Sequence, residues 1–319
     1  MVKLKLKPQA PPFTIQIETS EFCNLRCSFC GTRGMKVQST NLMTVQTAQR
    51  IADEIARVGW RSKIAFGMHG EPTFNPMFLT IVREIRKRLP RTTMHVFTNG
   101  YGIMHSADPA DYIMQMAEAG INNVILDHYS PTGDAAKVVA MFDDVVELKA
   151  GIPLFSTGLG FRVLSVPPID LDNKNKSTRR LANHCGAAAP LDKTFNNKRC
   201  TMPFRELSIR WDGNVALCCD DFRGEYPIAN VNDMPIDELW NHERFQAARI
   251  MLYNYSRDFK PCDGCTNISS RVGFLPDPQG QEMLPDIMTP DGKEARKIVN
   301  KVSKVEKPLA EIVKRPWEK

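Results

Sequence analysis

The sequence predicts an α/β protein in which parallel strands alternate with helices, followed by a smaller second region. Apolar residues switch between strand-like alternation and helical spacing about every 25–30 residues through the first half of the chain. Gly, Asn and Pro punctuate the ends of these segments. Residues 167–199 are rich in Asn, Lys and Pro and interrupt the periodicity before a new hairpin pattern begins.

The strands and helices of the first half follow from these patterns. Strands are expected at 13–19, 63–68, 94–97, 123–127, 152–156 and 160–166, and helices at 44–58, 76–89, 109–119 and 134–149. Such alternation implies βαβ units and a parallel sheet, either open or closed into a partial barrel. The carboxyl ends of these strands would converge on one mouth.

The second region begins with a hairpin. Residues 207–210 and 215–217 alternate in polarity around Asp212-Gly213, which is a strong turn signal. An amphipathic helix is expected at 236–252 and a weaker helix at 292–303. The chain is therefore divided into a basic extension at 1–12, a core at 13–166, a linker at 167–199, a small domain at 200–274 and a basic tail at 275–319.

Composition is typical of a folded protein, with 42% hydrophobic and 24% charged residues among 319. No run of 18 apolar residues predicts a membrane span, and the start lacks the apolar stretch of a signal peptide, so we expect a cytoplasmic protein.

The net charge of +6 lies in the ends: residues 1–12 carry +3, and residues 293–319 hold nine Lys or Arg against four Glu. Basic ends either bind nucleic acid or another acidic partner, or are solvated tails.

Nine cysteines fall in groups, and clustered thiols in a reducing compartment indicate metal. Cys23, Cys27 and Cys30 form C-x3-C-x2-C directly after the first strand. Three thiolates either join a fourth ligand such as His69 around zinc, or hold a 4Fe–4S cluster with one iron left open for a substrate or cofactor.

A second group supplies four thiolates: Cys200 before the hairpin, Cys218 at its end, and the C-x2-C pair Cys262 and Cys265. Four ligands make a closed site, and spacing alone does not separate zinc from iron–sulfur. Cys185 and Cys219 are left over; Cys219 is interpreted as a small buried apolar residue, and both remain alternative ligands.

The first group resembles the radical S-adenosylmethionine (radical SAM) superfamily. The shared features are the three-cysteine motif with aromatic Phe29, Gly70-Glu71-Pro72 after the second strand, Thr98-Asn99-Gly100 after the third, and Asp127 ending the fourth. The resemblance implies a partial (β/α)6 barrel, a 4Fe–4S cluster on Cys23, Cys27 and Cys30, and SAM held near Phe29, Gly70, Glu71, Pro72, Asn99 and Asp127. It disfavours zinc at this site.

The second group resembles the SPASM/Twitch auxiliary domain of the same superfamily. Besides its cysteines it has Ile228-Ala229-Asn230-Val231 and Glu238-Leu239-Trp240-Asn241. A full SPASM domain has seven cysteines and two clusters, whereas this chain has the spacing for one, so the shorter Twitch type is implied. One auxiliary 4Fe–4S cluster would then be bound by Cys200, Cys218, Cys262 and Cys265.

The resemblance implies that SAM is cleaved reductively to a 5′-deoxyadenosyl radical, which abstracts a hydrogen atom from the substrate. It also implies a low-potential electron donor such as flavodoxin or ferredoxin. The auxiliary cluster would accept an electron from the substrate radical; substrate binding and a structural role are the alternatives.

The residues leave the substrate class open. A peptide is the first expectation, with a small-molecule alcohol dehydrogenase of the Twitch type or a nucleic-acid-modifying enzyme as alternatives. A non-catalytic Fe–S or zinc protein that binds nucleic acid is the non-enzyme alternative. No catalytic acid or base is identified.

A few side chains are candidates to face the substrate or to bind an acidic group on it. They are His69, His128 and Tyr129 at strand ends, and Arg205, Arg210 and Arg223 near the auxiliary site. Scaffold hydrogen bonding for the histidines and exposed ion pairing for the arginines are the alternatives.

Overall fold

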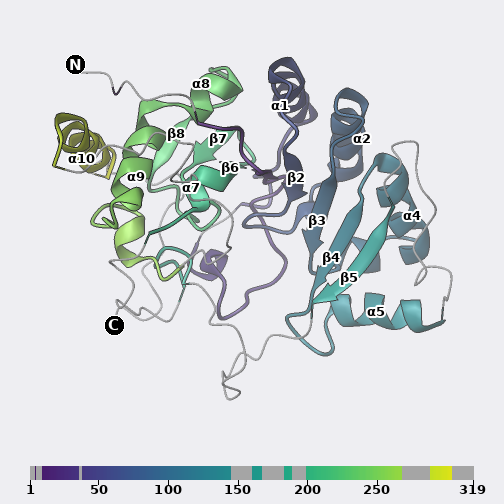
Figure 1. Cartoon of the computed structure of the whole chain (residues 1–319). Coiled ribbons are helices and arrows are strands. Elements are labelled where there is room, and N and C mark those ends of the chain that lie inside the picture. The colour runs from purple at the N-terminus through teal and green to yellow at the C-terminus, as the bar shows by residue number, and fades with distance from the viewer. Residues whose placement is uncertain are drawn as a thin grey trace.

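A single eight-stranded sheet organises the chain in the order β5-β4-β3-β2-β1-β6-β7-β8. The structure is a computed structural model that describes residues 4, 9–35, 38–144, 160–166, 183–188, 199–267 and 288–303. Figure 1 shows the sheet running from β5 at the right to β8 at the left. It is an open, mostly parallel sheet rather than a closed barrel.

The strands are β1 (Thr14–Ile17), β2 (Lys63–Phe66), β3 (Met94–Thr98), β4 (Asn123–Asp127), β5 (Arg162–Val166), β6 (Glu206–Ile209), β7 (Asn214–Ala216) and β8 (Pro227–Asn230). The helices are α1 (Val45–Val58), α2 (Phe78–Arg88), α3 (Tyr101–Met104), α4 (Pro109–Ala119), α5 (Asp134–Asp144), α7 (Met202–Arg205), α8 (Ile236–Trp240), α9 (Glu243–Tyr253) and α10 (Pro290–Ser303). Short 3-10 turns occur at Gly31–Gly34, Pro72–Phe74 and Cys262–Gly264.

The second region shares the sheet of the first. β6 pairs in parallel with β1, with Thr14 opposite Glu206 and Ile17 opposite Ile209. The sixth parallel strand among the described residues thus comes from the hairpin domain, on the opposite side of the sheet from β5. The expected strand at 152–156 lies outside the described residues. Periodicity alone does not show that two regions share one sheet, because strand order is a tertiary property.

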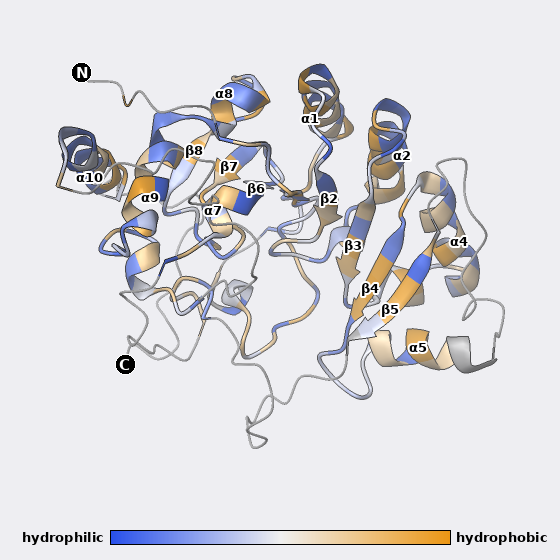
Figure 2. Cartoon of the chain, viewed as in Figure 1, coloured by the Kyte–Doolittle hydropathy of each residue, from blue (hydrophilic) through white to orange (hydrophobic). Residues whose placement is uncertain are grey.

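Helix boundaries follow local chemistry. The Thr44 side chain caps α1 by accepting from the Thr47 amide, and Gly59 ends it in the left-handed conformation. The inner face of α1 is buried through Ile51, Ala52 and Ile55. Figure 2 shows orange segments on β3, β4 and β5, whereas α1 and α2 carry both orange and blue, as expected for helices with one face on the sheet.

The expected helix at 236–252 is two helices, because α8 ends at Trp240 and α9 begins at Glu243. The His242 backbone is extended, and its side chain accepts from the Arg244 amide, which caps α9. The helix expected at 292–303 is present as α10, which packs along α9 (Figure 1). No helix in the part of the chain that the structure describes is long and apolar enough to cross a membrane.

Candidate active site and auxiliary thiol site

The first thiol group lies in the loop that leaves β1. Cys23, Cys27 and Cys30 are half-buried. Burial raises the pKa of Cys23 to about 12 and that of Cys27 to about 11, and the neighbouring thiols add to both shifts. Burial therefore disfavours the bare thiolates of Cys23 and Cys27, and cationic iron would offset this cost.

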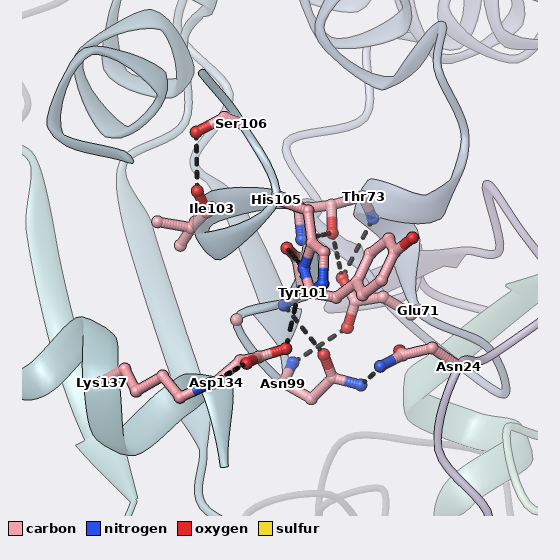
Figure 3. Close-up of polar contacts among 12 residues, drawn as sticks. Asn24, Glu71, Thr73, Asn99, Tyr101, Ile103, His105, Ser106, Asp134 and Lys137 are labelled. Atoms are coloured by element: carbon pink, nitrogen blue, oxygen red, sulfur yellow. Dashed lines mark hydrogen bonds and ion pairs between the residues drawn. The ribbon is translucent and has the colours of Figure 1, made fainter. Parts of the chain in front are cut away.

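Glu71 anchors the neighbouring strand ends rather than pointing outward (Figure 3). Its carboxylate accepts from the Thr98 hydroxyl at 2.7 Å, the Thr73 amide at 3.1 Å and the Asn99 amide at 2.9 Å. Burial raises the pKa of Glu71, and these donors oppose the shift. The side chain thus ties the segment after β2 to the end of β3.

Gly70 is required by a close approach of two backbones. A Cβ at this position would lie 2.6 Å from the Phe22 carbonyl oxygen and closer still to that of Ser20. The Glu71 amide donates to the Phe22 carbonyl at 2.9 Å, and the Thr19 hydroxyl donates to the Pro72 carbonyl at 3.2 Å. Gly70-Glu71-Pro72 is therefore packed directly on the start of the cysteine loop.

Asn99 links the end of β3 to the same loop. Its side-chain amide donates to the Asn24 oxygen at 3.1 Å and approaches the Cys23 sulfur at 3.6 Å. Its oxygen accepts from the Tyr101 amide at 3.0 Å. Figure 3 shows dashed contacts from Asn99 to both Glu71 and Asn24. The structure thus brings Cys23, Glu71 and Asn99 together.

Asp127 and Phe29 meet through Tyr129, which follows β4. The Tyr129 hydroxyl donates to Asp127 at 3.2 Å, and its ring lies 5.3 Å from that of Phe29. Burial raises the pKa of Asp127 to about 6, with the Tyr129 hydrogen bond opposing the shift. Asp127 therefore changes charge just below neutral pH, on the same side of the sheet as the thiol loop.

The second thiol group gathers five cysteines. Cys200, Cys218, Cys262 and Cys265 are buried, and so is Cys185, which was left without a partner by the sequence patterns. Cys185, Cys218 and Cys265 form one contact group beside Met202. Burial raises the pKa of Cys200 to about 12, and the neighbouring Cys218 adds to the shift.

A small apolar cluster packs beside the first thiol group and includes residues near the second in sequence. Met35, Ala187 and Phe222 form this cluster, and Cys30 packs against it. The packing is tight, since a Cβ on Gly31 would lie 2.7 Å from the Phe222 ring. Ala187 and Cys185 belong to the same short segment, so one segment reaches both sites.

A buried charge network joins β1, β2 and the hairpin. His69 Nδ1 lies 2.7 Å from Glu18, and its Nε2 lies 3.0 Å from the Cys219 carbonyl oxygen. Arg210 is buried between Glu18 and Glu21. Both ring nitrogens of His69 and the guanidinium of Arg210 are thus occupied by protein groups. Burial raises the pKa of Glu18, but His69 and Arg210 outweigh this and lower it overall.

Most other candidate substrate-facing side chains are also engaged by the protein. His128 lies 3.1 Å from the Ser165 hydroxyl, Arg223 lies 3.9 Å from Glu225, and Arg205 stacks over the Phe13 ring. The expectation that the arginines pair in solvent is wrong for Arg210, whose partners Glu18 and Glu21 follow β1 and are buried with it, and for Arg223, which is also buried.

Sequence reasoning missed the segment at 183–188, which it assigned to a linker. Asn183 donates to the Gly264 carbonyl at 2.7 Å, and Thr266 Oγ1 accepts from the Asn183 amide at 3.0 Å. The only signal in the sequence was Cys185 itself. A lone cysteine in a polar stretch has no spacing partner, so its neighbours follow only from the fold.

The fold gathers thiols at two places, three in the loop after β1 and a larger buried group in the second region. The Radical SAM superfamily model matches residues 17–148, and the model of SPASM, an iron–sulfur cluster-binding domain, matches residues 200–266. The chain belongs to the radical SAM superfamily, carries a C-terminal SPASM domain and is an enzyme that uses SAM and 4Fe–4S clusters. The non-enzyme alternative is wrong.

Curated relatives differ in the reactions their names describe. The S-adenosyl-L-methionine-dependent 2-deoxy-scyllo-inosamine dehydrogenase of Niallia circulans is 22% identical over 80% of this chain and 93% of its own. The tungsten-containing aldehyde ferredoxin oxidoreductase cofactor-modifying protein of Pyrococcus furiosus is 22% identical over 79% of this chain and 86% of its own. A probable GTP 3′,8-cyclase of Thermococcus kodakarensis is 28% identical over 44% of this chain and 43% of its own.

Among solved structures, the crystal structure of BtrN in complex with AdoMet and 2-DOIA superposes with a TM-score of 0.64 at 20% identity, covering 82% of this chain and 95% of that one. This likeness concerns the fold.

The residues fit the groups that the family requires. Both sites present thiols as their common donors, and the second is buried and closed. Within the described ranges, no three or more His, Cys, Asp or Glu are arranged to hold a single metal ion.

Proposed function

We propose that this enzyme oxidises a hydroxyl-bearing small molecule to the carbonyl compound. The observation that carries the proposal is that the two regions that carry the thiol sites share one sheet and also meet in one small apolar cluster, Met35, Ala187 and Phe222, beside Cys30. A fixed relation between the sites suits removal of two electrons from one substrate. The dehydrogenase relative, which matches along most of both chains, supports the same choice.

The overall change is removal of one hydrogen atom from the carbinol carbon, followed by loss of one proton and one electron. When bound, SAM and its cluster supply the 5′-deoxyadenosyl radical for the first loss, and the auxiliary cluster supplies the acceptor for the second electron. The two hydrogens leave as 5′-deoxyadenosine C–H and as a proton.

In that scheme the residues of this chain bind the two clusters and hold SAM in place. We assign Cys23, Cys27 and Cys30 to the SAM cluster, and Cys200, Cys218, Cys262 and Cys265 to the auxiliary cluster. Gly70-Glu71-Pro72, Asn99, Asp127 and Phe29 surround SAM in this assignment. Because Thr73, Thr98 and Asn99 donate to the Glu71 carboxylate, this side chain positions the segment beside SAM rather than binding it directly.

His69 is a positioning residue in the proposal. Its two nitrogens face Glu18 and the Cys219 carbonyl, so it fixes the hairpin end next to Cys218 against β1. Neither nitrogen is free to take the substrate proton.

The test is substrate-dependent SAM cleavage. The reconstituted enzyme, SAM and dithionite are incubated with a panel of cyclitols and amino sugars deuterated at the carbinol carbon, and in parallel with peptides and with nucleotides. We expect deuterium in 5′-deoxyadenosine and a product lighter by two hydrogens with one of the alcohols. Turnover with a peptide, the first expectation from the sequence, or with a nucleotide, and with none of the alcohols, contradicts the proposal.

A low-potential electron donor such as flavodoxin or ferredoxin is part of the proposal, since dithionite only replaces it in the assay. Nucleic acid binding through the basic ends stays a prediction. Most of residues 1–12 and residues 304–319 lie outside the described residues, whereas 293–303 belong to α10.

A further inference from the structure

Five thiols, rather than four, meet at the auxiliary site. Cys185 is buried and shares a contact group with Cys218 and Cys265. Cys200 and Cys262 pack in the main core instead, although both lie close enough to Cys218 and Cys265 to affect each other's pKa. A cubane cluster with four irons takes four protein thiolates, so one thiol is in excess.

The position of Cys185 is built by specific contacts. Asn183 clamps the segment to the Cys262–Cys265 knuckle, donating to the Gly264 carbonyl and accepting from the Thr266 amide at 2.9 Å. On the next residue, His184 Nδ1 lies 3.0 Å from Asp220, two residues beyond Cys218. The segment is therefore fixed to both chain segments that carry Cys218 and Cys265.

The backbone around Cys185 is held in an unfavourable conformation. His184 and Cys185 have φ values of 46° and 54°, in the left-handed region that side chains other than glycine disfavour. Such conformations persist where the surrounding structure enforces them. Here the enforced turn directs a thiol onto two neighbouring thiols.

We propose that Cys185 is a fifth iron ligand of the auxiliary cluster, able to replace Cys218 or Cys265 but not Cys200 or Cys262. The selectivity follows from the contacts, because Cys185 touches the first two and not the second two. In the exchange one iron–sulfur bond to Cys185 forms and one to Cys218 or Cys265 breaks. The proton of the Cys185 thiol passes to the released cysteine, so there is no change of redox state.

The inference rests on the auxiliary ligand set assigned above and is independent of the substrate. The test uses the full chain with Cys23, Cys27 and Cys30 replaced by Ala, so that only the auxiliary cluster remains. After anaerobic reconstitution this parent should hold about four irons. Iron content and the electron paramagnetic resonance signal of the reduced cluster are measured for each variant, and activity is not needed.

Cys218→Ala and Cys265→Ala should each keep about four irons in this background, with an altered resonance signal. Adding Cys185→Ala to either should remove nearly all iron. Cys200→Ala and Cys262→Ala should remove nearly all iron with Cys185 intact. Cys185→Ala alone and the control Cys219→Ala should match the parent.

Loss of iron in Cys218→Ala and Cys265→Ala as complete as in the double variants overturns the inference. Insolubility of these single variants counts as such a loss, because the metal of a small domain supplies its folding energy. If Cys200→Ala and Cys262→Ala keep their iron, the assigned ligand set fails instead, so the two failures are distinguishable.

Discussion

The two thiol sites are assembled in opposite ways. Cys23, Cys27 and Cys30 lie within eight residues of one loop and stay half-exposed. The five auxiliary thiols come from four separate places between residues 185 and 265, and all are buried. A local, accessible motif leaves room for a small-molecule cofactor, whereas a distributed, buried site couples metal binding to folding of the surrounding chain.

The largest effect is expected at the local site. Cys23→Ala, Cys27→Ala or Cys30→Ala should each reduce SAM cleavage to background, because only three ligands are available. The fold should survive, since the loop is half-exposed and β1 is held by β2 and β6. Formation of 5′-deoxyadenosine and far-ultraviolet circular dichroism measure the two properties.

Ser28→Ala is the matched control, because Ser28 is an exposed residue in the same loop. It should retain near-parent cleavage. Substantial formation of 5′-deoxyadenosine by any of the three cysteine variants would contradict the assignment of Cys23, Cys27 and Cys30 to the SAM cluster.

Removal of iron should affect the folding of the two regions differently, and this is the next largest effect. Anaerobic chelation should strip hydrogen-exchange protection from residues 200–266 while β2, β3 and α2 stay protected. The reason is that the auxiliary cluster would cross-link the segments that carry Cys200, Cys218, Cys262 and Cys265, whereas β2, β3 and α2 carry no thiol and pack in the shared apolar core. Equal loss of protection in both regions would show that the auxiliary cluster does not stabilise residues 200–266 more than the rest of the fold.

Sequence patterns predicted the local features well. The bounds of β4 and α4 are those expected, and Glu71, Asn99 and Asp127 all lie at strand ends beside the thiol loop or its neighbours. These features depend on nearest neighbours in the chain and on the rule that parallel strands end at one edge.

Tertiary placement was not predictable. Nothing in residues 206–209 shows that they pair with β1 rather than with another strand of their own domain, and nothing near Cys185 shows that it reaches Cys218. The break between α8 and α9 was also missed. It depends on one side chain, His242, capping the second helix.

Gly70 allows the segment after β2 to pack directly on the start of the loop that carries the open site. Gly70→Ala should destabilise the protein by about 3 kcal/mol or more, since the new Cβ meets backbone atoms that cannot move aside. Gly59→Ala is the control: φ is 69° but nothing lies within 4 Å, so strain alone costs about 1–2 kcal/mol. Chemical denaturation measures both, and equal losses would contradict the close approach.

The smallest effect concerns SAM affinity and pH, and it tests whether Asp127 belongs to the open site. Its pKa of about 6 means that the carboxylate dominates above pH 6 and the neutral acid below. A charged acceptor forms stronger hydrogen bonds to ligand hydroxyls than a neutral one, by about 1 kcal/mol. Because about a quarter of Asp127 is already ionised at pH 5.5, SAM binding should tighten about two- to threefold as pH rises from 5.5 to 7.5. Asp127→Asn should bind SAM more weakly at pH 7.5 and lose this pH dependence.

Tyr129→Phe should move the midpoint to higher pH, because the Tyr129 hydroxyl stabilises the carboxylate. Equilibrium dialysis of SAM against the reconstituted enzyme at each pH measures these changes. A parent enzyme whose affinity is flat across this range would place Asp127 outside the SAM site.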